Sequence, residues 1–189
     1  FENIFVVLES AYSMSGDLSP LIEITDLKKS YSFYLYVDEA HSFGIYGEKG
    51  QGYCYEQGVS DKVDFIMSTL SKATSSVGGF LASEHKYCSL LRWSDAYTFQ
   101  ACLTPADAAV ILACLDEIED NPEIIKELHS KNKYMRDLLV SKKFNLGQSQ
   151  SPIIPIMIED HNKLRIVVKE LFQEGVYSTP IVYPAGKIN

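Results

Sequence analysis

Basic residues are scarce in this chain: 17 Lys and Arg stand against 25 Asp and Glu among 189 residues, which gives a formal net charge of −8. An acidic chain without a basic run is a poor match for the phosphate backbone of nucleic acids. No apolar stretch reaches the roughly 20 residues that a membrane-spanning helix needs. The first five residues, FENIF, lack the basic segment that begins a secretory signal. We therefore expect no nucleic-acid partner, no membrane segment in this chain and a cytoplasmic location.

Cysteine is sparse as well, and histidine forms no obvious metal motif. The four cysteines show no C-x-x-C spacing, so we interpret them as reduced thiols of a cytosolic protein. His85, His129 and His161 have no second ligand at metal-binding spacing, and no metal site is expected. The chain begins inside an apolar run and stops just after a strand-like segment, whereas a free-standing domain usually begins and ends in polar sequence. We interpret it as a truncated piece of a longer polypeptide.

Apolar runs of strand length alternate with helical periodicity in the first half of the chain. Residues 4–8 are almost continuously apolar, which predicts a strand buried on both faces. Further strands are predicted at residues 33–37, 63–67 and 79–82, and an amphipathic helix at residues 21–31. This alternation predicts an α/β fold with a mostly parallel sheet.

The second half begins with two helical patterns and then returns to alternation. Helices are predicted at residues 106–118, 123–140 and 163–172, the last of them stopped by Gly175, and strands at residues 153–158 and 176–182. We expect residues 1–120 to form part of a large domain. Residues 121–189 would then form a linking helix and the start of a small C-terminal α/β domain.

Polar side chains follow three of the predicted strands. Ser13 follows the first strand, Asp38 and His41 follow the second, and Thr69 and Lys72 follow the third. Because ligand-binding groups gather at the carboxyl ends of parallel strands, these residues are expected to converge on one crevice.

Lys72 is the first candidate for chemistry. It lies among hydroxyl residues and before the pair Gly78-Gly79, directly after an apolar strand. A lysine that forms a Schiff base needs a partly desolvated site where its amine can lose a proton, and hydroxyls with backbone N–H groups suit a phosphate dianion. The alternative interpretation is an exposed loop lysine.

The sequence Asp-Glu-Ala-His at residues 38–41 is the second candidate. Asp38 at a strand end can hold a cation or a protonated ring nitrogen, and His41 can point to the same pocket; alternatively, Asp38 caps the next turn and His41 is solvated. The same four letters are the Mg²⁺-binding signature of one class of helicases. That function needs a G-x-x-x-x-G-K-[ST] loop, which is not found, because residues 44–50 have neither the spacing nor the hydroxyl. Ser13 could bond a cofactor, although a Ser before Gly-Asp is more often a turn residue.

Three motifs occur in order along the chain: ESAYSM at residues 9–14 with Gly16-Asp17, VDEAHSFG at residues 37–44, and TLSKA at residues 69–73 with Gly78-Gly79. Together they resemble the α-oxoamine synthase family, which are fold-type I pyridoxal-phosphate enzymes such as amino-oxononanoate synthase, ketobutyrate ligase, aminolevulinate synthase and serine palmitoyltransferase. The similarity continues through residues 152–155 and 175–176 to residues 183–185 and covers essentially the whole chain. The fold that the resemblance implies is part of the large pyridoxal-phosphate-binding domain with the start of the small domain.

The resemblance also implies a role for each candidate residue. Lys72 would form the Schiff base with pyridoxal 5'-phosphate and move protons at the substrate Cα. Asp38 would pair with the pyridinium nitrogen and keep it protonated. His41 and Ser13 would lie near the phenolic oxygen of the ring, and Thr69 would bond the phosphate. The implied reaction is the decarboxylative condensation of an amino acid with an acyl-CoA to an aminoketone, in a homodimer.

Two departures from the family pattern bear on function. Family members commonly carry a Ser/Thr-Thr pair that reaches the phosphate of the neighbouring subunit's cofactor, whereas this chain has Gln100-Ala101, and Ala101 has no side-chain donor. The amino-terminal half of the family pattern, and the Arg that binds the substrate carboxylate, have no counterpart. An alternative function is a non-catalytic partner subunit of the same fold; Ala101 favours it, whereas the retained Lys72, Asp38 and His41 favour an enzyme.

Overall fold

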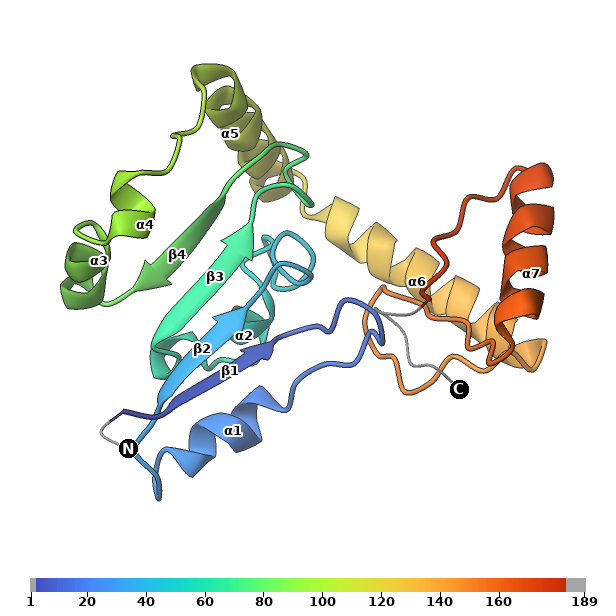
Figure 1. Ribbon diagram of the computed structural model, residues 1–189, viewed down its shortest axis with the longest axis horizontal. Helices are drawn as coiled ribbons and strands as arrows, with labels where there is room; N and C mark the ends of the chain where they lie inside the picture. The colour runs from blue at the N-terminus through green and yellow to red at the C-terminus, as the bar shows by residue number, and fades with distance from the viewer. Residues whose placement is uncertain (1–2, 183–189) are drawn as a thin grey trace.

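A four-stranded sheet organises the computed structural model, which describes residues 3–182. The strands are β1 (Phe5–Glu9), β2 (Tyr34–Asp38), β3 (Phe65–Thr69) and β4 (Gly79–Ser83), in the order β1-β2-β3-β4. β1, β2 and β3 run parallel, and β4 pairs antiparallel with β3 (Figure 1). The four strands predicted in the first half of the chain are therefore present, each shifted by at most two residues.

The four predicted helices are present as α1, α5, α6 and α7, whereas the short helices α2, α3 and α4 were not predicted. They are α1 (Leu21–Leu27), α2 (Tyr53–Glu56), α3 (His85–Leu91), α4 (Asp95–Thr98), α5 (Pro105–Asp120), α6 (Glu123–Ser141) and α7 (His161–Gln173), with a short 3₁₀ turn η1 (Ser60–Lys62). Thr104 begins α5 by accepting a hydrogen bond from the backbone N–H of Asp107, and Asp160 caps α7 in the same way. α1 ends four residues earlier than predicted, because residues 28–30 continue as hydrogen-bonded turns.

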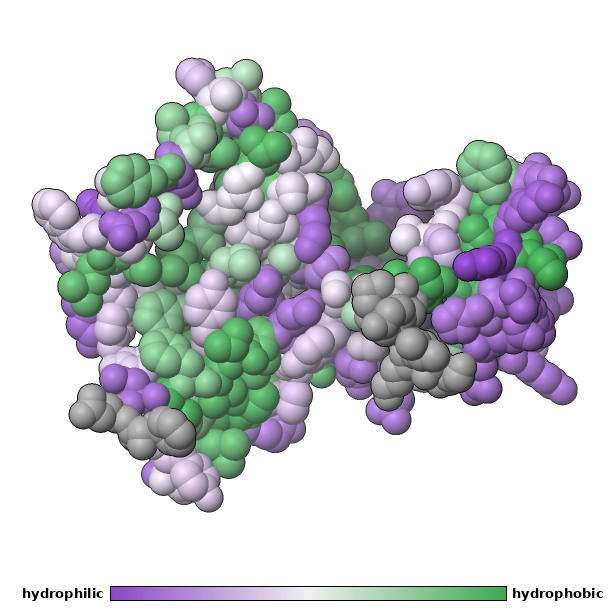
Figure 2. Space-filling model, in the orientation of Figure 1, coloured by the Kyte–Doolittle hydropathy of each residue, from purple (hydrophilic) through white to green (hydrophobic). Residues whose placement is uncertain are grey.

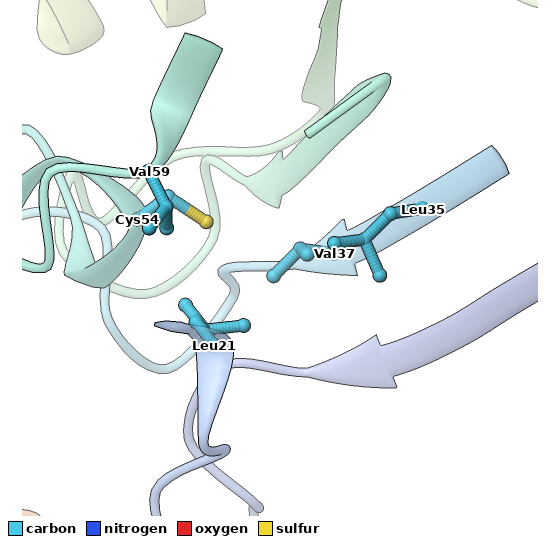
Figure 3. Packing of buried hydrophobic residues seen from close by; sticks show 5 residues of the cluster. All are labelled: Leu21, Leu35, Val37, Cys54 and Val59. Atoms are coloured by element: carbon cyan, nitrogen blue, oxygen red, sulfur yellow. The ribbon is translucent and has the colours of Figure 1, made fainter. Parts of the chain in front are cut away.

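The core lies on one face of the sheet, between β2 and the short helices. Leu35 and Val37 of β2 are fully buried, and they pack with Leu21 of α1 and with Cys54 and Val59 of the α2 region (Figure 3). Burying each aliphatic side chain of this size contributes about 1.5–3 kcal/mol. This packing fixes β2 between α1 and α2 and so fixes the point at which Asp38 leaves the sheet.

The opposite face of the sheet is aromatic and is open over β1, which corrects the prediction for the first strand. Phe5 and Val7 of β1 are 55% and 66% exposed, although a strand buried on both faces was predicted. Phe5 stacks on Tyr34 with ring centroids 5.0 Å apart, and Phe65 extends the same layer. We call these side chains, with Tyr36, the aromatic face; Figure 2 shows apolar residues gathered over this part of the molecule. The prediction failed because burial on both faces requires a second covering layer, and among residues 3–182 the helical layer over β1 lies on the other side.

The two strands predicted in the C-terminal part are wrong. Residues 153–158 and 176–182 form neither strand nor helix; one backbone hydrogen bond, from Met157 to Asn145, ties the first of these segments to the loop before it. An apolar run becomes a strand only beside a partner that completes its ladder, and the described part of the chain supplies none there. The predicted stop at Gly175 is confirmed: its φ is +80°, and the N–H of Val176 bonds the carbonyl of Leu171 as α7 ends.

Candidate active site

The carboxyl ends of β1, β2 and β3 meet at one edge of the sheet. In the strand register Glu9 lies beside Asp38, and Asp38 lies beside Met67. The loops that carry the candidate residues therefore leave the sheet side by side. This parallel register is the physical reason why residues far apart in the sequence share one site.

His41 and Lys72 are in direct contact at this edge. The Nζ atom of Lys72 lies 2.8 Å from Nε2 of His41, and the two residues are 31 positions apart. The loop of Lys72 is folded back on itself: Leu70 donates its N–H to the carbonyl of Gly78, and the buried Thr74 donates its hydroxyl to the carbonyl of Leu70. These bonds turn the Lys72 side chain toward the loop after β2.

The electrostatic surroundings of His41 bring four charged or ionisable groups into one place. Partial burial of the imidazole lowers the pKa of His41, and the nearby ammonium of Lys72 lowers it further. The carboxylates of Glu9 and Asp38 act in the opposite direction. Because the lowered pKa favours the neutral imidazole, Nε2 can accept a hydrogen bond from the ammonium of Lys72.

Asp38 is oriented by the turn that follows β2. Its Oδ1 atom accepts a hydrogen bond of 2.7 Å from the N–H of Ala40, so its predicted capping contact is present. The backbone carbonyl of Asp38 accepts from both the N–H and the hydroxyl of Ser10. These contacts hold the carboxylate at the end of β2, beside the loop of His41.

Thr69 and Ser71 form a pair of hydroxyls at the end of β3. Their Oγ1 and Oγ atoms lie 2.7 Å apart, and the backbone N–H of Ser71 donates to the hydroxyl of Thr69. Thr69 also donates to the carbonyl of Gly78. The two hydroxyls beside a lysine are the kind of donors that a phosphate group takes, and they would bind one by exchanging their present contacts within the loop.

Ser13 lies on an exposed turn at the same edge, as the turn interpretation predicted. Its backbone N–H donates to Oε2 of Glu9 at 3.0 Å. The structure thus brings His41 and Lys72 into contact, with Asp38 and Glu9 close enough to affect the pKa of His41. Ser13 is tied to this group through Glu9.

Two acidic residues were missed by the sequence reasoning. Glu9 connects the Ser13 turn to the end of β1. Glu39 is only 1% exposed, and its Oε1 atom accepts a 2.6 Å hydrogen bond from the N–H of Cys54. Burial raises the pKa of Glu39, while the hydrogen bonds from the first turn of α2 oppose that rise. The sequence feature that could have predicted this contact is the glycine-rich loop that follows Glu39, at residues 44–52.

Two further classes of feature are not found in the part of the chain that the structure describes. Over residues 3–182, no group of three or more His, Cys, Asp or Glu side chains is arranged to hold a metal ion. Within the same range, no helix is both long and apolar enough to cross a bilayer.

Known proteins match this chain along nearly its whole length. Residues 1–187 match the family described as aminotransferase class I and II. The serine palmitoyltransferase of Bacteroides ovatus is 38% identical over 181 residues, which are 95% of this chain and 46% of that protein. The 8-amino-7-oxononanoate synthase of Petrotoga mobilis is 32% identical over 180 residues, again 95% of this chain and 46% of the relative.

Solved structures give the same result. The Sphingomonas wittichii serine palmitoyltransferase superposes with a TM-score of 0.91 at 32% identity, covering 97% of this chain and 47% of that one. A serine palmitoyltransferase solved with its PLP internal aldimine has a TM-score of 0.87 at 32% identity, covering 96% and 47%. The chain spans about half the length of the curated relatives it matches.

Proposed function

Because the chain belongs to the class I and II aminotransferases and, within them, to the α-oxoamine synthases, we propose that it supplies the cofactor-binding edge of a pyridoxal-phosphate-dependent acyltransferase. The family and the fold-type I architecture are those that the three sequence motifs predicted. The observation that carries the proposal is the 2.8 Å contact between Lys72 and His41 at the edge where β2 and β3 end.

The donor set at this edge fits pyridoxal phosphate. Lys72 offers the amine that would hold the cofactor covalently, and Thr69, together with the neighbouring Ser71, offers hydroxyls for the phosphate. The Asp38 carboxylate would pair with the protonated ring nitrogen, and His41 and Ser13 would contact the phenolic oxygen. When bound, the cofactor supplies an electron sink that stabilises negative charge at the substrate Cα.

The residues of this chain would then divide the work of proton transfer. Lys72 takes and returns the proton at the substrate Cα, which requires its amine to lose its charge. His41, whose own pKa is lowered, accepts a hydrogen bond from Lys72 and so holds Nζ in place. The Asp38 carboxylate would stabilise a positive charge on the ring nitrogen of the bound cofactor.

The overall reaction that we propose is the condensation of an amino acid with an acyl-CoA, with loss of CO₂ and CoA. The names of the relatives support it, because they include serine palmitoyltransferases and 8-amino-7-oxononanoate synthases. We further propose a cytoplasmic homodimer, and the division into residues 1–120 and 121–189 as parts of a large and a small domain. Which amino acid and which acyl chain are used depends on pocket shape in the whole protein.

The alternative function is a non-catalytic partner subunit of the same fold. One observation favours it: Ala101 has no side-chain donor, at a position where the family resemblance implies one for the neighbouring subunit's cofactor. The contact between Lys72 and His41 favours the enzyme, since a subunit without chemistry has no need of it.

The test uses the full-length protein loaded with pyridoxal phosphate and reduced with borohydride. We expect a pyridoxyl group on the peptide that contains Lys72, and we expect this label to be absent from the Lys72→Ala variant. Lys126→Ala, which removes an exposed lysine paired with Glu123 on α6, is the matched control and should keep the label. A label on another lysine would overturn the assignment of Lys72.

A second assay separates the enzyme from the partner subunit. Release of CoA is measured for the protein alone over Gly, Ala and Ser with short and long acyl thioesters. Turnover by the protein alone supports the enzyme. A bound chromophore without turnover for any pair, with turnover restored by a second subunit, would favour the non-catalytic partner.

A further inference from the structure

The turn that carries Ser13 is closed on itself but is largely exposed on its outer side. Tyr12 donates its N–H to the carbonyl of Asp17, and Gly16 donates to the carbonyl of Tyr12. Residues 12–15 are all exposed, whereas Gly16 is buried. The base of the turn is anchored by the bridge between Ala11 and Leu18, and its inner side meets the rest of the chain at Gly16.

A segment from the distant C-terminal part of the chain lies directly against Gly16. The backbone N–H groups of Gln150 and Ser151 both donate to the Gly16 carbonyl at 3.0 Å. Gly16 has a φ of +71°, and a Cβ there would lie 2.3 Å from Oγ of Ser149 and 2.5 Å from the carbonyl oxygen of Ile153. The approach is so close that only glycine fits between the two segments.

Arg136 of α6 holds that segment in place. Its Nη1 atom donates to the carbonyl of Ser149 at 2.8 Å, and its Nη2 atom donates to the carbonyl of Ser151 at 2.6 Å and to the hydroxyl of Ser149 at 3.2 Å. Ser151 is fully buried. A planar guanidinium reaches two carbonyls at once, whereas a lysine ammonium offers only a point charge. We call Arg136, Ser149, Ser151 and Gly16 the Gly16 junction.

We propose that the Gly16 junction is a positioning device for the cofactor site, with Arg136 and Ser149 as positioning residues that act through the Ser13 turn. α6 fixes residues 149–151, these fix Gly16, and Gly16 fixes the turn whose Ser13 N–H reaches Glu9 beside Asp38 and His41. The inference deepens the proposed function and rests on it for the role of Ser13. It couples the long helix after residue 120 to the edge of the sheet.

The first experiment needs no cofactor and therefore tests the junction by itself. Amide hydrogen exchange is measured in the full-length protein for residues 12–17 and for β2. We expect Arg136→Lys to speed exchange in the turn by about tenfold, the equivalent of one lost charge-assisted hydrogen bond, and to leave β2 unchanged. Arg165→Lys, on exposed α7, is the control. Unchanged exchange in residues 12–17 would overturn the proposal.

The second experiment asks whether the junction acts through the hydroxyl of Ser13, which the proposed function places on the cofactor and which Ser13→Ala removes while keeping the N–H bond to Glu9. The dissociation constant of pyridoxal phosphate and the absorption maximum of the bound cofactor are measured for Arg136→Lys, Ser13→Ala and the double variant. We expect Arg136→Lys to weaken binding about tenfold alone and by less than about twofold in the Ser13→Ala background, because coupled residues give non-additive effects. Additive effects would overturn the claim that Arg136 acts on the cofactor through the Ser13 hydroxyl. If the wild-type protein binds no cofactor, the proposed function is refuted. The hydrogen-exchange result would then still test whether the Gly16 junction positions the Ser13 turn.

A glycine substitution provides an independent variant of the same junction. Gly16→Ala should loosen the turn more than Gly175→Ala, because the two have similar φ values of +71° and +80° but position 175 has no atom within 4 Å of the added Cβ. Equal effects of the two substitutions on exchange in the turn would contradict the close approach at Gly16.

Discussion

The substitution Gly52→Ala would drive a methyl group into the carboxylate that anchors the loop after His41. Gly52 precedes α2 with a φ of 105° and a ψ of 176°. A Cβ at this position would lie 1.8 Å from Oε2 of Glu39 and 2.7 Å from its Cδ atom. Glu39 must therefore withdraw and lose its hydrogen bond from the N–H of Cys54, or α2 must move.

The expected cost has two parts. A non-glycine residue in this region of backbone space costs about 1–3 kcal/mol. Losing the buried bond between Glu39 and Cys54 adds about 1–3 kcal/mol, because both groups are then unsatisfied away from water. Gly58→Ala is a control for the first part: its φ is +65° and nothing lies within 4 Å of the added Cβ, so it should cost about 1–2 kcal/mol.

Thermal unfolding followed by circular dichroism measures the difference. We expect Gly52→Ala to lower Tm further than Gly58→Ala by about 2–12 °C, which corresponds to the additional 1–3 kcal/mol at about 2–4 °C per kcal/mol. In a Glu39→Ala background the collision is gone, and Gly52→Ala should then cost only the backbone part, about 1–3 kcal/mol. If Gly52→Ala costs the same with and without the Glu39 carboxylate, the anchoring role of Glu39 is refuted.

Three further predictions concern titration and thiol chemistry. Burial raises the pKa of Glu39 above its ordinary value of 4.5, so the native state holds this proton more tightly than the unfolded state. The stability that the protonated carboxyl contributes is therefore greatest below about pH 4.5 and is lost as pH rises. Glu39→Gln should flatten the fall in unfolding free energy above about pH 4.5, as measured by urea titrations. The ammonium of Lys72 lowers the pKa of His41, so Lys72→Ala should raise it, and an NMR titration that shows no rise would contradict their contact. Cys54 is buried with a raised pKa, whereas Cys102 is exposed, so a thiol reagent should modify Cys102 in the native protein and reach Cys54 only on unfolding.

The sheet and the central contact could be predicted because local pattern and a general topological rule were sufficient. Strand-length apolar runs separated by helical periodicity predicted the four strands, and the long periodic stretches predicted α5 and α6. The rule that polar residues gather at the carboxyl ends of parallel strands then predicted that His41 and Lys72 would lie together. The two residues are 31 positions apart in the sequence. The parallel pairing of β2 with β3 brings them together, and the hydrophobic pattern of the strands favours that pairing.

Features that depend on partners far along the chain were beyond such reasoning. In the sequence, Glu39 is only part of the motif Asp-Glu-Ala-His. Its burial depends on the packing of α2, which begins after Gly52. The junction at Gly16 joins atoms 133 residues apart, between the hydroxyl of Ser149 and the Gly16 carbonyl. The strands predicted at residues 153–158 and 176–182 failed for the same reason, since a strand exists only with a neighbour that the local sequence does not reveal.

The aromatic face and the outer edge of β1 have a practical consequence for biochemistry on this chain. β2 is the neighbour of β1 on one side of the described sheet, and the exposed rings and aliphatic groups beside the other margin include Phe5 and Val7. An open strand margin next to apolar side chains is a template for self-association. Preparations of the 189-residue polypeptide by itself should thus cloud at high concentration and in high salt, and replacing Val7 by lysine should keep them clear.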